Sequence, residues 1–296
     1  MNPDSKRHTL PDRYAVLGHP VAHSQSPFIH AEFARQTGEH IEYDRIDSPL
    51  DAFEATVRHF IASADPAAGL GRAHGCNITV PFKFQVLPLA RRASDRAVLA
   101  QAANVLRFDA DGWFADNTDG CGLVRDIQLH AGLALRGKRV LLIGAGGAAS
   151  GVLGPLIEAG CAAINVANRT PAKALRLLQH HAAWAGQHGV ALAATGLGDA
   201  GAGFDVVINS SASSLAGAGV PVAPSVLKRG ALAIDLMYGR PAQAFLDWAT
   251  AHGAQGRDGL GMLVEQAAGA FALWRGVVPD TPPVLAALRA RLAAKG

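Results

Sequence analysis

The stretch "RVLLIGAGGAASG", residues 139–151, decides the fold of one half of the chain. An apolar run predicts a buried strand, and a glycine-rich turn and a helix follow it directly. Gly144, Gly146 and Ala149 fill the GxGxxA form of a dinucleotide fingerprint, in which the first glycine makes the tight turn and the second admits a pyrophosphate. The helix from Gly147 offers free amides and its positive end. The stretch predicts a nucleotide-binding turn at Gly144, Ala145, Gly146, Gly147 and Ala148; the alternative is a plain glycine-rich turn.

The segments after this turn continue the pattern of a doubly wound sheet. Apolar runs predict strands at 163–167, near Val190, at 205–209 and at 231–235, with helices up to Ala159 and over 171–186. Residues 210–219, rich in Ala, Gly and Ser, predict a mobile loop. The second half of the chain is therefore expected to be a Rossmann-like domain.

The end of the second strand in this half bears on the choice of cofactor. A cofactor with a free ribose 2′-hydroxyl calls for an acidic residue about 20 residues after the first glycine. The chain has Asn168 there, followed by Arg169, Thr170 and Lys173, which suit a 2′-phosphate. Thr170 before Pro171 is also a good helix N-cap. The segment favours NADP over NAD.

The first half alternates short strands and helices in a βαβ rhythm. Strands are predicted at 14–18, 41–46, 77–83, 104–108 and 113–116, and helices at 27–37, 50–62 and 119–131. Two further helices, 262–274 and 282–294, close the chain. With 296 residues, two domains are expected. The predicted class is α/β, with a substrate domain of residues 1–118 plus 262–296 and an NADP-binding Rossmann-like domain of residues 119–261.

Composition excludes several classes of protein. Hydrophobic residues make up 49% and charged residues 17%, a balance typical of globular α/β enzymes. The net charge of +3 comes without a basic run interleaved with aromatics, so no nucleic-acid partner is expected. Residues 140–157 lack charge over nearly the length of a membrane span, but their glycines and Pro155 favour a strand, turn and helix. No membrane partner is expected.

Cysteine and histidine spacing predicts neither disulfides nor a metal site. Cys76, Cys121 and Cys161 are far apart and form no CxxC pair. None of the 12 histidines falls in a metal-ligand spacing such as HExxH. The first residues lack the apolar core of a signal peptide. A cytoplasmic protein is the expectation.

Three polar stretches of the first half are candidates for chemistry. In "NITVPFK", residues 77–83, alternation places Asn77, Thr79 and Lys83 on one side of a strand; the alternative is an edge strand with its polar side in water. In "NTDG", residues 117–120, Asp119 begins a helix, where capping and catalysis are equally good explanations. In "HSQSPFIH", residues 23–30, Ser24 and Ser26 can seat a carboxylate, although Ser26 before Pro27 also suits a helix cap.

Taken in order, eight segments resemble the shikimate dehydrogenases along nearly the whole chain. They are "YAVLGHPVAHSQSPFIH", "NITVPFK", "AAN", "NTDG", "LIGAGGAA", "NRT", "DLMY" and "DGLGMLVEQA". The resemblance implies a substrate domain, an NADP domain and an active cleft between them. It also implies that Lys83 and Asp119 are the catalytic pair, that Lys83 protonates the oxygen on which charge develops, and that the ligands are shikimate and 3-dehydroshikimate.

The resemblance also assigns binding residues. Ser24 and Ser26 would hold the carboxylate of the substrate, with the ring hydroxyls bound by Asn77, Thr79, Asn104, Asp119 and Gln266, and Tyr238 close by. Leu236 and Gly259 would lie beside the nicotinamide, and Asp95 near the cofactor. The chain departs from the family pattern at Gln25, Val105, Leu236 and Ser150, and in "NSSASS" from Asn209. Ser150 stands where an arginine is often found, which weakens the argument for a phosphate.

Two other functions fit the same residues. A quinate or dual quinate/shikimate dehydrogenase would use the same cleft, often with NAD. A sensor that binds NADP and a partner protein without turnover would keep the nucleotide site but has no need of a proton donor such as Lys83. The chain is expected to act as a monomer or a homodimer.

Overall fold

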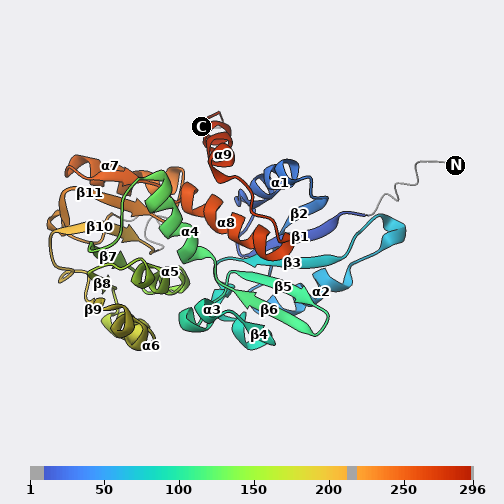
Figure 1. Cartoon of the computed structure of the whole chain (residues 1–296), viewed down its shortest axis with the longest axis horizontal. Helices are drawn as coiled ribbons and strands as arrows, with labels where there is room; N and C mark the ends of the chain where they lie inside the picture. Colours follow the sequence, from blue (N-terminus) through green and yellow to red (C-terminus); the bar gives the residue numbers. More distant parts are fainter. Residues whose placement is uncertain (1–9, 212–218, 295–296) are drawn as a thin grey trace.

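A computed structural model of the chain describes residues 10–211 and 219–294. Figure 1 shows two sheets side by side, with helices α4 (Asp119–Arg125) and α8 (Leu260–Arg275) between them. Each sheet has six strands. The α/β class is therefore confirmed. Most of the predicted mobile loop at 210–219 lies outside the described residues.

The first sheet is mixed, with strand order β2-β1-β3-β5-β6-β4. Strand β1 is parallel to β2 and β3, whereas β5 runs antiparallel to β3 and β6. The short strand β4 lies parallel to β6 at the edge. The strands are β1 (Asp12–Gly18), β2 (Ile41–Asp47), β3 (Ala73–Ile78), β4 (Arg92–Ala93), β5 (Val105–Asp109) and β6 (Gly112–Asp116).

The predicted strand at 77–83 is wrong in its bounds, and the alternative of an edge strand is wrong as well. Strand β3 ends at Ile78, and the chain then turns through Pro81 into a 3₁₀ turn, η2 (Phe82–Phe84). Lys83 therefore does not share a strand face with Asn77. Nor is β3 an edge strand, because β1 and β5 pair with it on either side. Buried Phe82, stacked on Phe53 with ring centroids 4.8 Å apart, fixes this turn against the core.

The second sheet is parallel throughout, with strand order β12-β11-β10-β7-β8-β9. The chain winds outward from β7 in both directions, so the order reverses between β7 and β10. In such sheets a crevice for ligands opens at the carboxyl ends of the strands at this reversal. The strands are β7 (Arg139–Ile143), β8 (Ala163–Ala167), β9 (Ala191–Thr195), β10 (Phe204–Asn209), β11 (Leu227–Asp235) and β12 (Gln255–Arg257). The predicted Rossmann-like fold is confirmed.

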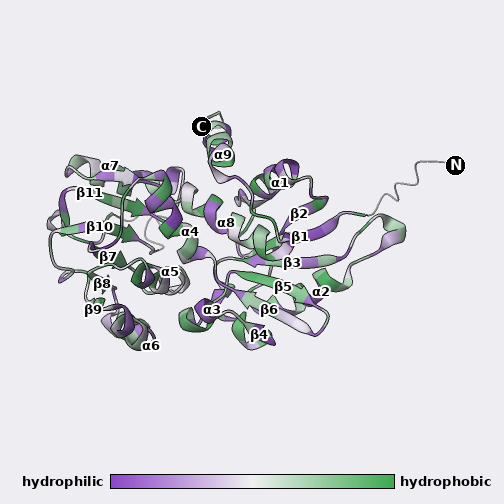
Figure 2. Ribbon diagram, in the orientation of Figure 1, coloured by the Kyte–Doolittle hydropathy of each residue, from purple (hydrophilic) through white to green (hydrophobic). Residues whose placement is uncertain are grey.

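Helices cover both faces of each sheet. In the second sheet, residues of β7 alternate between two cores: Leu142 packs toward α4, α5 and α6, and Leu141 toward α7. Apolar residues accordingly run along the inner strands β7 and β10 (Figure 2). The remaining helices are α1 (Ser26–Thr37), α2 (Phe53–Ala62), α3 (Asp95–Ala100), α5 (Gly147–Glu158), α6 (Pro171–His188), α7 (Arg240–Ala251) and α9 (Thr281–Ala293). The sequence analysis did not predict α3, α7, β4 or β12.

Close packing of α4 joins the two halves of the molecule. A Cβ on Gly120 would lie 2.4 Å from the carbonyl oxygen of Gly151 in α5, and one on Gly122 would lie 2.6 Å from the amide of Gln266 in α8. Only glycine permits these approaches. After Arg125 the helix continues as a π-helical turn, Asp126–His130. Within the described residues, none of the helices has the length and apolar character needed to span a membrane.

Candidate active site

Lys83 and Asp119 meet at the junction of the two halves. Lys83 is presented by the η2 turn, and its carbonyl accepts a hydrogen bond from the Ala103 amide at 3.0 Å. Asp119 is the first residue of α4, where no side chain caps the helix. The Lys83 Nζ atom lies 2.5 Å from Asp119 Oδ2, and both side chains are largely buried, with exposures of 13% and 5%. Capping alone therefore does not explain Asp119.

Asn104 connects Asp119 with the other predicted polar residues. Its Nδ2 atom lies 2.9 Å from Asp119 Oδ1 and 3.0 Å from Gln266 Oε1, and its Oδ1 accepts from the Thr118 amide. The Asn104 carbonyl in turn accepts from Asn77 Nδ2 at 3.3 Å. Residues from β3, from the start of β5, from α4 and from α8 thus form one buried polar cluster.

The two serines lie at the start of α1, also next to this cluster. Ser24 Oγ donates to Ser26 Oγ at 3.1 Å, and Arg45 holds the Ser24 carbonyl at 2.6 Å. Gln25, not Ser26, is the N-cap, and Ser26 makes no capping bond. Burial raises the pKa of Tyr238, while the backbone of Gln25 hydrogen-bonds to it and acts in the opposite direction. Tyr238 therefore reaches from the second half of the chain to the serine loop.

A cavity of about 690 Å³ opens beside Lys83, along the carboxyl end of β7. The predicted turn residues Gly144, Ala145, Gly146, Gly147 and Ala148 all line it, together with Asn168 and Arg169. Gly144 adopts φ of 109°, which favours glycine. A Cβ on Gly147 would come within 3.4 Å of Lys83 Cβ. The glycine-rich turn and the lysine therefore share one cavity.

The residues predicted to select NADP lie at the outer end of this cavity. Arg169 lines it and is exposed, and none of the described side chains forms an ion pair with it. Thr170 is the N-cap of α6 but makes no side-chain capping bond. Thr170 and Lys173 do not line the cavity themselves. Ser150 is buried and donates to the Ala100 carbonyl at 2.6 Å, so it links α5 to α3 instead of facing a phosphate.

Three further predicted cofactor residues, besides Thr170 and Lys173, lie outside the cavity lining. Asp95 is exposed in the first turn of α3. Leu236 and Gly259 lie next to each other, since the Gly259 amide donates to the Met237 carbonyl and a Cβ on Gly259 would be 2.3 Å from the Leu236 carbonyl oxygen. Their roles beside a cofactor stay predictions.

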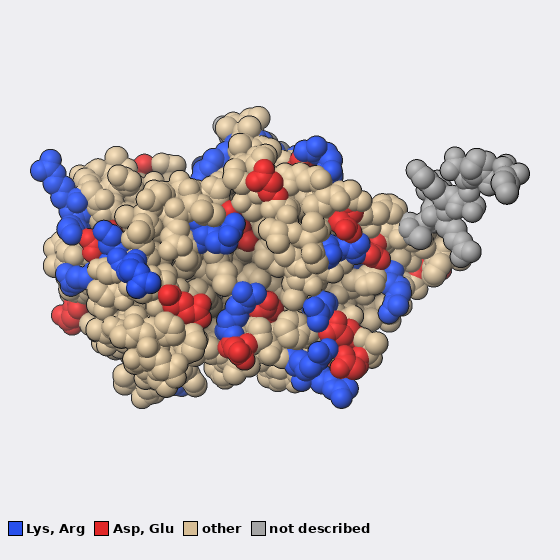
Figure 3. All heavy atoms as spheres, in the orientation of Figure 1, with Lys and Arg blue, Asp and Glu red and all other residues tan. Residues whose placement is uncertain are grey.

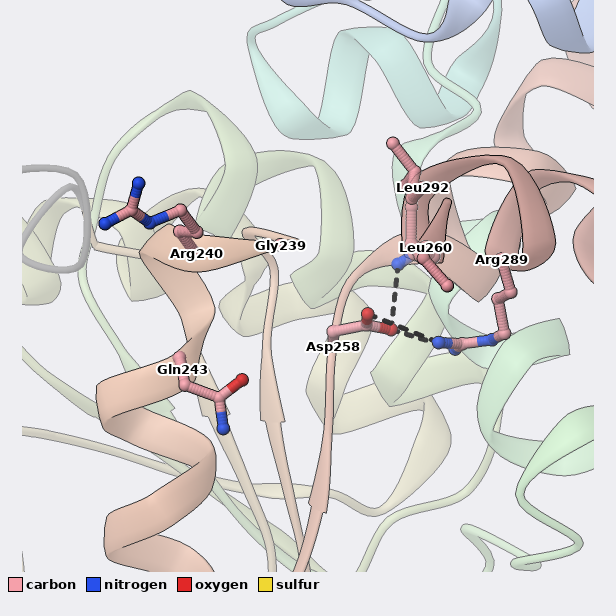
Figure 4. A pocket seen from close by; sticks show the side chains of 8 residues that line it. Gly239, Arg240, Gln243, Asp258, Leu260, Arg289 and Leu292 are labelled. Atoms are coloured by element: carbon pink, nitrogen blue, oxygen red, sulfur yellow. Dashed lines mark hydrogen bonds and ion pairs between the residues drawn. The ribbon is translucent and has the colours of Figure 1, made fainter. Parts of the chain in front are cut away.

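A second hollow, of about 460 Å³, lies between α7, α8 and α9 and holds none of the predicted site residues. Asp258 pairs there with Arg289 at 2.9 Å, while Arg240 points away from that pair (Figure 4). On the face of the molecule seen in Figure 3, Lys and Arg are interspersed with Asp and Glu. Among the residues that the structure describes, no cluster of His, Cys, Asp or Glu could hold a metal ion.

The sequence analysis missed several residues at the site. Val80 and Phe84 line the cavity on either side of Lys83, and both are exposed. The sequence carried a signal for Phe84, which directly follows the lysine, but less for Val80, which precedes it by three positions. Tyr43, which donates to Asn77 Oδ1 at 2.6 Å, had no such signal. Its place in the site depends on the pairing of strands distant in sequence.

The second half of the chain is a parallel, doubly wound sheet, and its glycine-rich turn lines a cavity beside the Lys83–Asp119 pair. These features define a two-domain, dinucleotide-dependent oxidoreductase. Three family models match the chain: the substrate binding domain of shikimate dehydrogenase at residues 16–106, shikimate / quinate 5-dehydrogenase at 127–237, and the shikimate 5′-dehydrogenase C-terminal domain at 259–289. The chain belongs to the shikimate dehydrogenase family.

Individual proteins are similar to this chain over nearly its full length. A protein of Methylibium petroleiphilum named shikimate dehydrogenase (NADP(+)) is 63% identical over 279 residues, covering 94% of each chain. The crystal structure of an Ael1 enzyme from Pseudomonas putida has a TM-score of 0.80 and 44% identity, covering 94% of this chain and 98% of that one. The enzyme of Thermus thermophilus in complex with NADP(H) and shikimate has a TM-score of 0.76 and 30% identity, covering 95% and 99%.

Proposed function

We propose that the chain catalyses the reversible, NADPH-dependent reduction of 3-dehydroshikimate to shikimate, a step toward the aromatic amino acids. One observation carries the proposal: the Lys83–Asp119 pair, 2.5 Å apart, lies between the glycine-rich turn and the buried polar cluster. Family membership and relatives named for this reaction and cofactor support it. A sensor would not need a buried ammonium group at this junction.

The chemistry assigned to the pair follows from where charge develops. When bound, NADPH would supply a hydride to the carbonyl carbon of the substrate, and negative charge would then develop on the carbonyl oxygen. The Lys83 ammonium stabilises that oxygen and transfers a proton to it. Asp119 holds Lys83 in place and is itself held by Asn104. In the reverse direction the same lysine accepts the proton.

The rest of the cluster binds the substrate in this proposal. Ser24 and Ser26 hold its carboxylate, and Tyr238 closes over them from the other half of the chain. Asn77, Thr79, Asn104 and Gln266 bind the ring hydroxyls. Buried amides and hydroxyls in a fixed network suit a small polyhydroxy acid, because a substrate lacking a hydroxyl would leave a buried group unpaired.

The second half of the chain binds NADP in this proposal. The pyrophosphate lies on the turn from Gly144 to Ala148, and Arg169 and Lys173 bind the 2′-phosphate beside Asn168 and Thr170. Leu236 and Gly259 lie near the nicotinamide, and Asp95 near the cofactor. We divide the chain into a substrate domain, residues 1–118 plus 262–296, and an NADP domain, residues 119–261. The protein acts in the cytoplasm on these small molecules, as a monomer or a homodimer.

The test is steady-state kinetics of Lys83→Ala with shikimate and NADP, followed by NADPH absorbance. We expect kcat to fall by about 10² or more, with a much smaller change in the KM for shikimate, because the ammonium acts mainly in the transition state. Lys228→Ala is the matched control, since Lys228 is exposed and pairs with Asp205 away from the cavity. Near-normal turnover of Lys83→Ala would remove the assignment.

Quinate is the second candidate substrate, because the model matching residues 127–237 describes shikimate and quinate enzymes together. Rates with shikimate and quinate, each with NADP and with NAD, decide between the two. We expect shikimate with NADP to give the highest kcat/KM. A preference for quinate with NAD would reverse the choice.

A further inference from the structure

An ion pair that the mechanism does not use lies directly before the segment that carries Asp119. Arg96 of α3 contacts the Asp116 carboxylate at the end of β6 with two nitrogens, Nε at 2.7 Å from Oδ1 and Nη2 at 2.5 Å from Oδ2. A two-point contact of this kind fixes the orientation of the carboxylate. The exposed fraction of the Asp116 side chain is 4%, and that of Arg96 is 37%. The pair is therefore buried on its aspartate side.

Two further donors hold the same carboxylate. Ser94, the N-cap of α3, donates to Asp116 Oδ1 at 2.5 Å, and the Asn117 amide donates to the same atom at 2.7 Å. Burial acts to raise the pKa of Asp116, but the donors around it, Arg96 first among them, outweigh burial and lower the pKa. Asp116 is therefore a charged acceptor at neutral pH, and hydrogen bonds to a charged group are the stronger kind.

Asn117 connects this anchored carboxylate with Asp119. Its Nδ2 atom donates to the Ala102 carbonyl at 2.9 Å, and its Oδ1 atom accepts from the Asp119 amide at 3.1 Å. Both partners are backbone groups, a carbonyl that only accepts and an amide that only donates, so together they fix the orientation of the Asn117 side chain. A Cβ on Gly151 of α5 would lie 2.8 Å from Asn117 Oδ1. The second half of the chain therefore packs directly against this segment.

Arg96 also contacts the chain beyond Asp119. Its Nη1 atom donates to Cys121 Sγ, in the first turn of α4, at 3.2 Å. One guanidinium thus touches a residue before Asp119 and a residue after it. A planar group with several donors suits this task, whereas a lysine has a single nitrogen and would lose part of these contacts.

We propose that Arg96 and Asp116 are positioning residues for the reaction, because their ion pair fixes residues 117–119. Through this segment the pair holds the Asp119 carboxylate against Lys83, 2.5 Å from its Nζ atom. The inference rests on the catalytic role given to Lys83 and Asp119 in the proposed function. Neither Arg96 nor Asp116 lines the nucleotide cavity, so both act through Asp119. A displacement of about 1 Å at a reacting group can lower a rate by roughly 10²-fold.

The first experiment measures kcat of Arg96→Ala with shikimate and NADP. We expect kcat to fall by about 10-fold to 100-fold, because Asp119 loses its fixed position, while the KM for NADP changes less than about twofold. Arg96→Lys keeps the charge but not the two-point contact, so its kcat should lie between those of Arg96→Ala and the wild type. It also carries the test if the alanine variant does not fold. Wild-type kcat in either variant overturns the proposal.

Arg107→Ala is the matched control. Arg107 of β5 makes the same kind of two-point contact with Asp109, at 2.7 and 3.0 Å, and its side chain has a similar exposed fraction of 33%. Its remaining hydrogen bond goes to the Leu273 carbonyl, so none of these bonds reaches residues 116–119. We expect wild-type kcat for this variant. A fall as large as that of Arg96→Ala would assign the effect to the sheet as a whole and overturn the positioning role.

A double-mutant cycle with Asp119→Asn separates this inference from the proposed function. If Arg96 acts through Asp119, Arg96→Ala lowers the kcat of the Asp119→Asn variant by a much smaller factor than it lowers that of the wild type. Equal factors in both backgrounds, the result of a merely structural role, overturn the inference. An Asp119→Asn variant with normal kcat removes the catalytic role of Asp119 itself, whereas normal Arg96→Ala beside an impaired Asp119→Asn overturns only the positioning role.

Discussion

In the proposed function, Arg169 is the side chain that selects NADP over NAD. It is exposed, lines the nucleotide cavity and directly follows Asn168, which replaces the expected acid. A guanidinium binds a phosphate through paired, charge-assisted hydrogen bonds, and NAD offers no such group. Ser150 is buried and donates to the Ala100 carbonyl, so in the proposed function the 2′-phosphate is bound by residues near the start of α6 instead.

Arg169→Ala is expected to raise the KM for NADP by about 10-fold to 100-fold, the effect of losing a hydrogen-bonded charge. The KM for NAD should change little, because NAD has no 2′-phosphate. Initial rates with each cofactor measure both values. Arg176→Ala serves as the control, because Arg176 is an exposed arginine of the following helix α6 and does not line the cavity. Equal losses with NADP and NAD would contradict a role in phosphate recognition.

Helices α1 and α8 and strand β2 meet at His30. The imidazole touches aromatic rings from all three elements, including Phe33, Tyr43 and Phe271. Burial lowers the pKa of His30 to about 3, while a hydrogen bond with the Asn77 side chain acts in the opposite direction. The packing of these elements therefore requires a neutral ring, whereas the unfolded chain binds a proton near pH 6.5.

The sign of the pH dependence follows from that difference. Below about pH 6.5 the unfolded state binds a proton that the folded state does not, so stability falls as the pH falls toward 3. We expect the free energy of unfolding of the wild type, relative to His30→Phe, to drop by about 1.4 kcal/mol per pH unit between pH 6 and 4. Urea unfolding at several pH values measures this. A constant difference across that range would contradict the buried neutral ring.

The two halves of the whole molecule are joined by a polar contact around Glu265. This buried carboxylate of α8 accepts from Arg125 at 2.6 Å and from Thr281 at 2.5 Å, and His130 Nε2 lies 2.7 Å from it. Burial acts to raise the pKa of Glu265, but the bonds from Thr281, Arg125 and His130 outweigh it and lower the pKa. The carboxylate thus links α4, the π-helical turn, α8 and α9.

Glu265→Gln is expected to lower the free energy of unfolding at pH 7 by about 2 kcal/mol, because three buried or part-buried donors lose their charged acceptor. The loss should shrink as the pH falls below about 4.3, the ordinary pKa of a glutamate, because the unfolded wild-type chain then binds a proton that the folded carboxylate does not. Urea unfolding measures both. Glu32→Gln, which breaks a surface pair with Arg35, should cost well under 1 kcal/mol. Equal losses of unfolding free energy for the two variants would contradict the role of Glu265 in joining the two halves.

Local patterns predicted the elements whose causes are local. The strand at 139–143 and its glycine turn were predictable because an apolar run and a tight turn depend on adjacent residues. The helix from Pro171 was predictable for the same reason, as were the strands at 105–109 and 112–116 with their turn. The short elements α3, β4 and β12 were not, because brief segments carry too little periodicity.

By itself, then, the sequence determined the fold class and the nucleotide turn, because spacing along the chain and residue type carry that information. The expectation that Lys83 and Asp119 form the catalytic pair came from the resemblance to a family. Only the tertiary structure decided that Lys83 leaves the strand for a 3₁₀ turn and meets Asp119, 36 positions further along the chain. The same holds for Tyr43 and Asn77, which pairing with β1 brings together. Contacts of this kind depend on how distant segments pack, which no local pattern records.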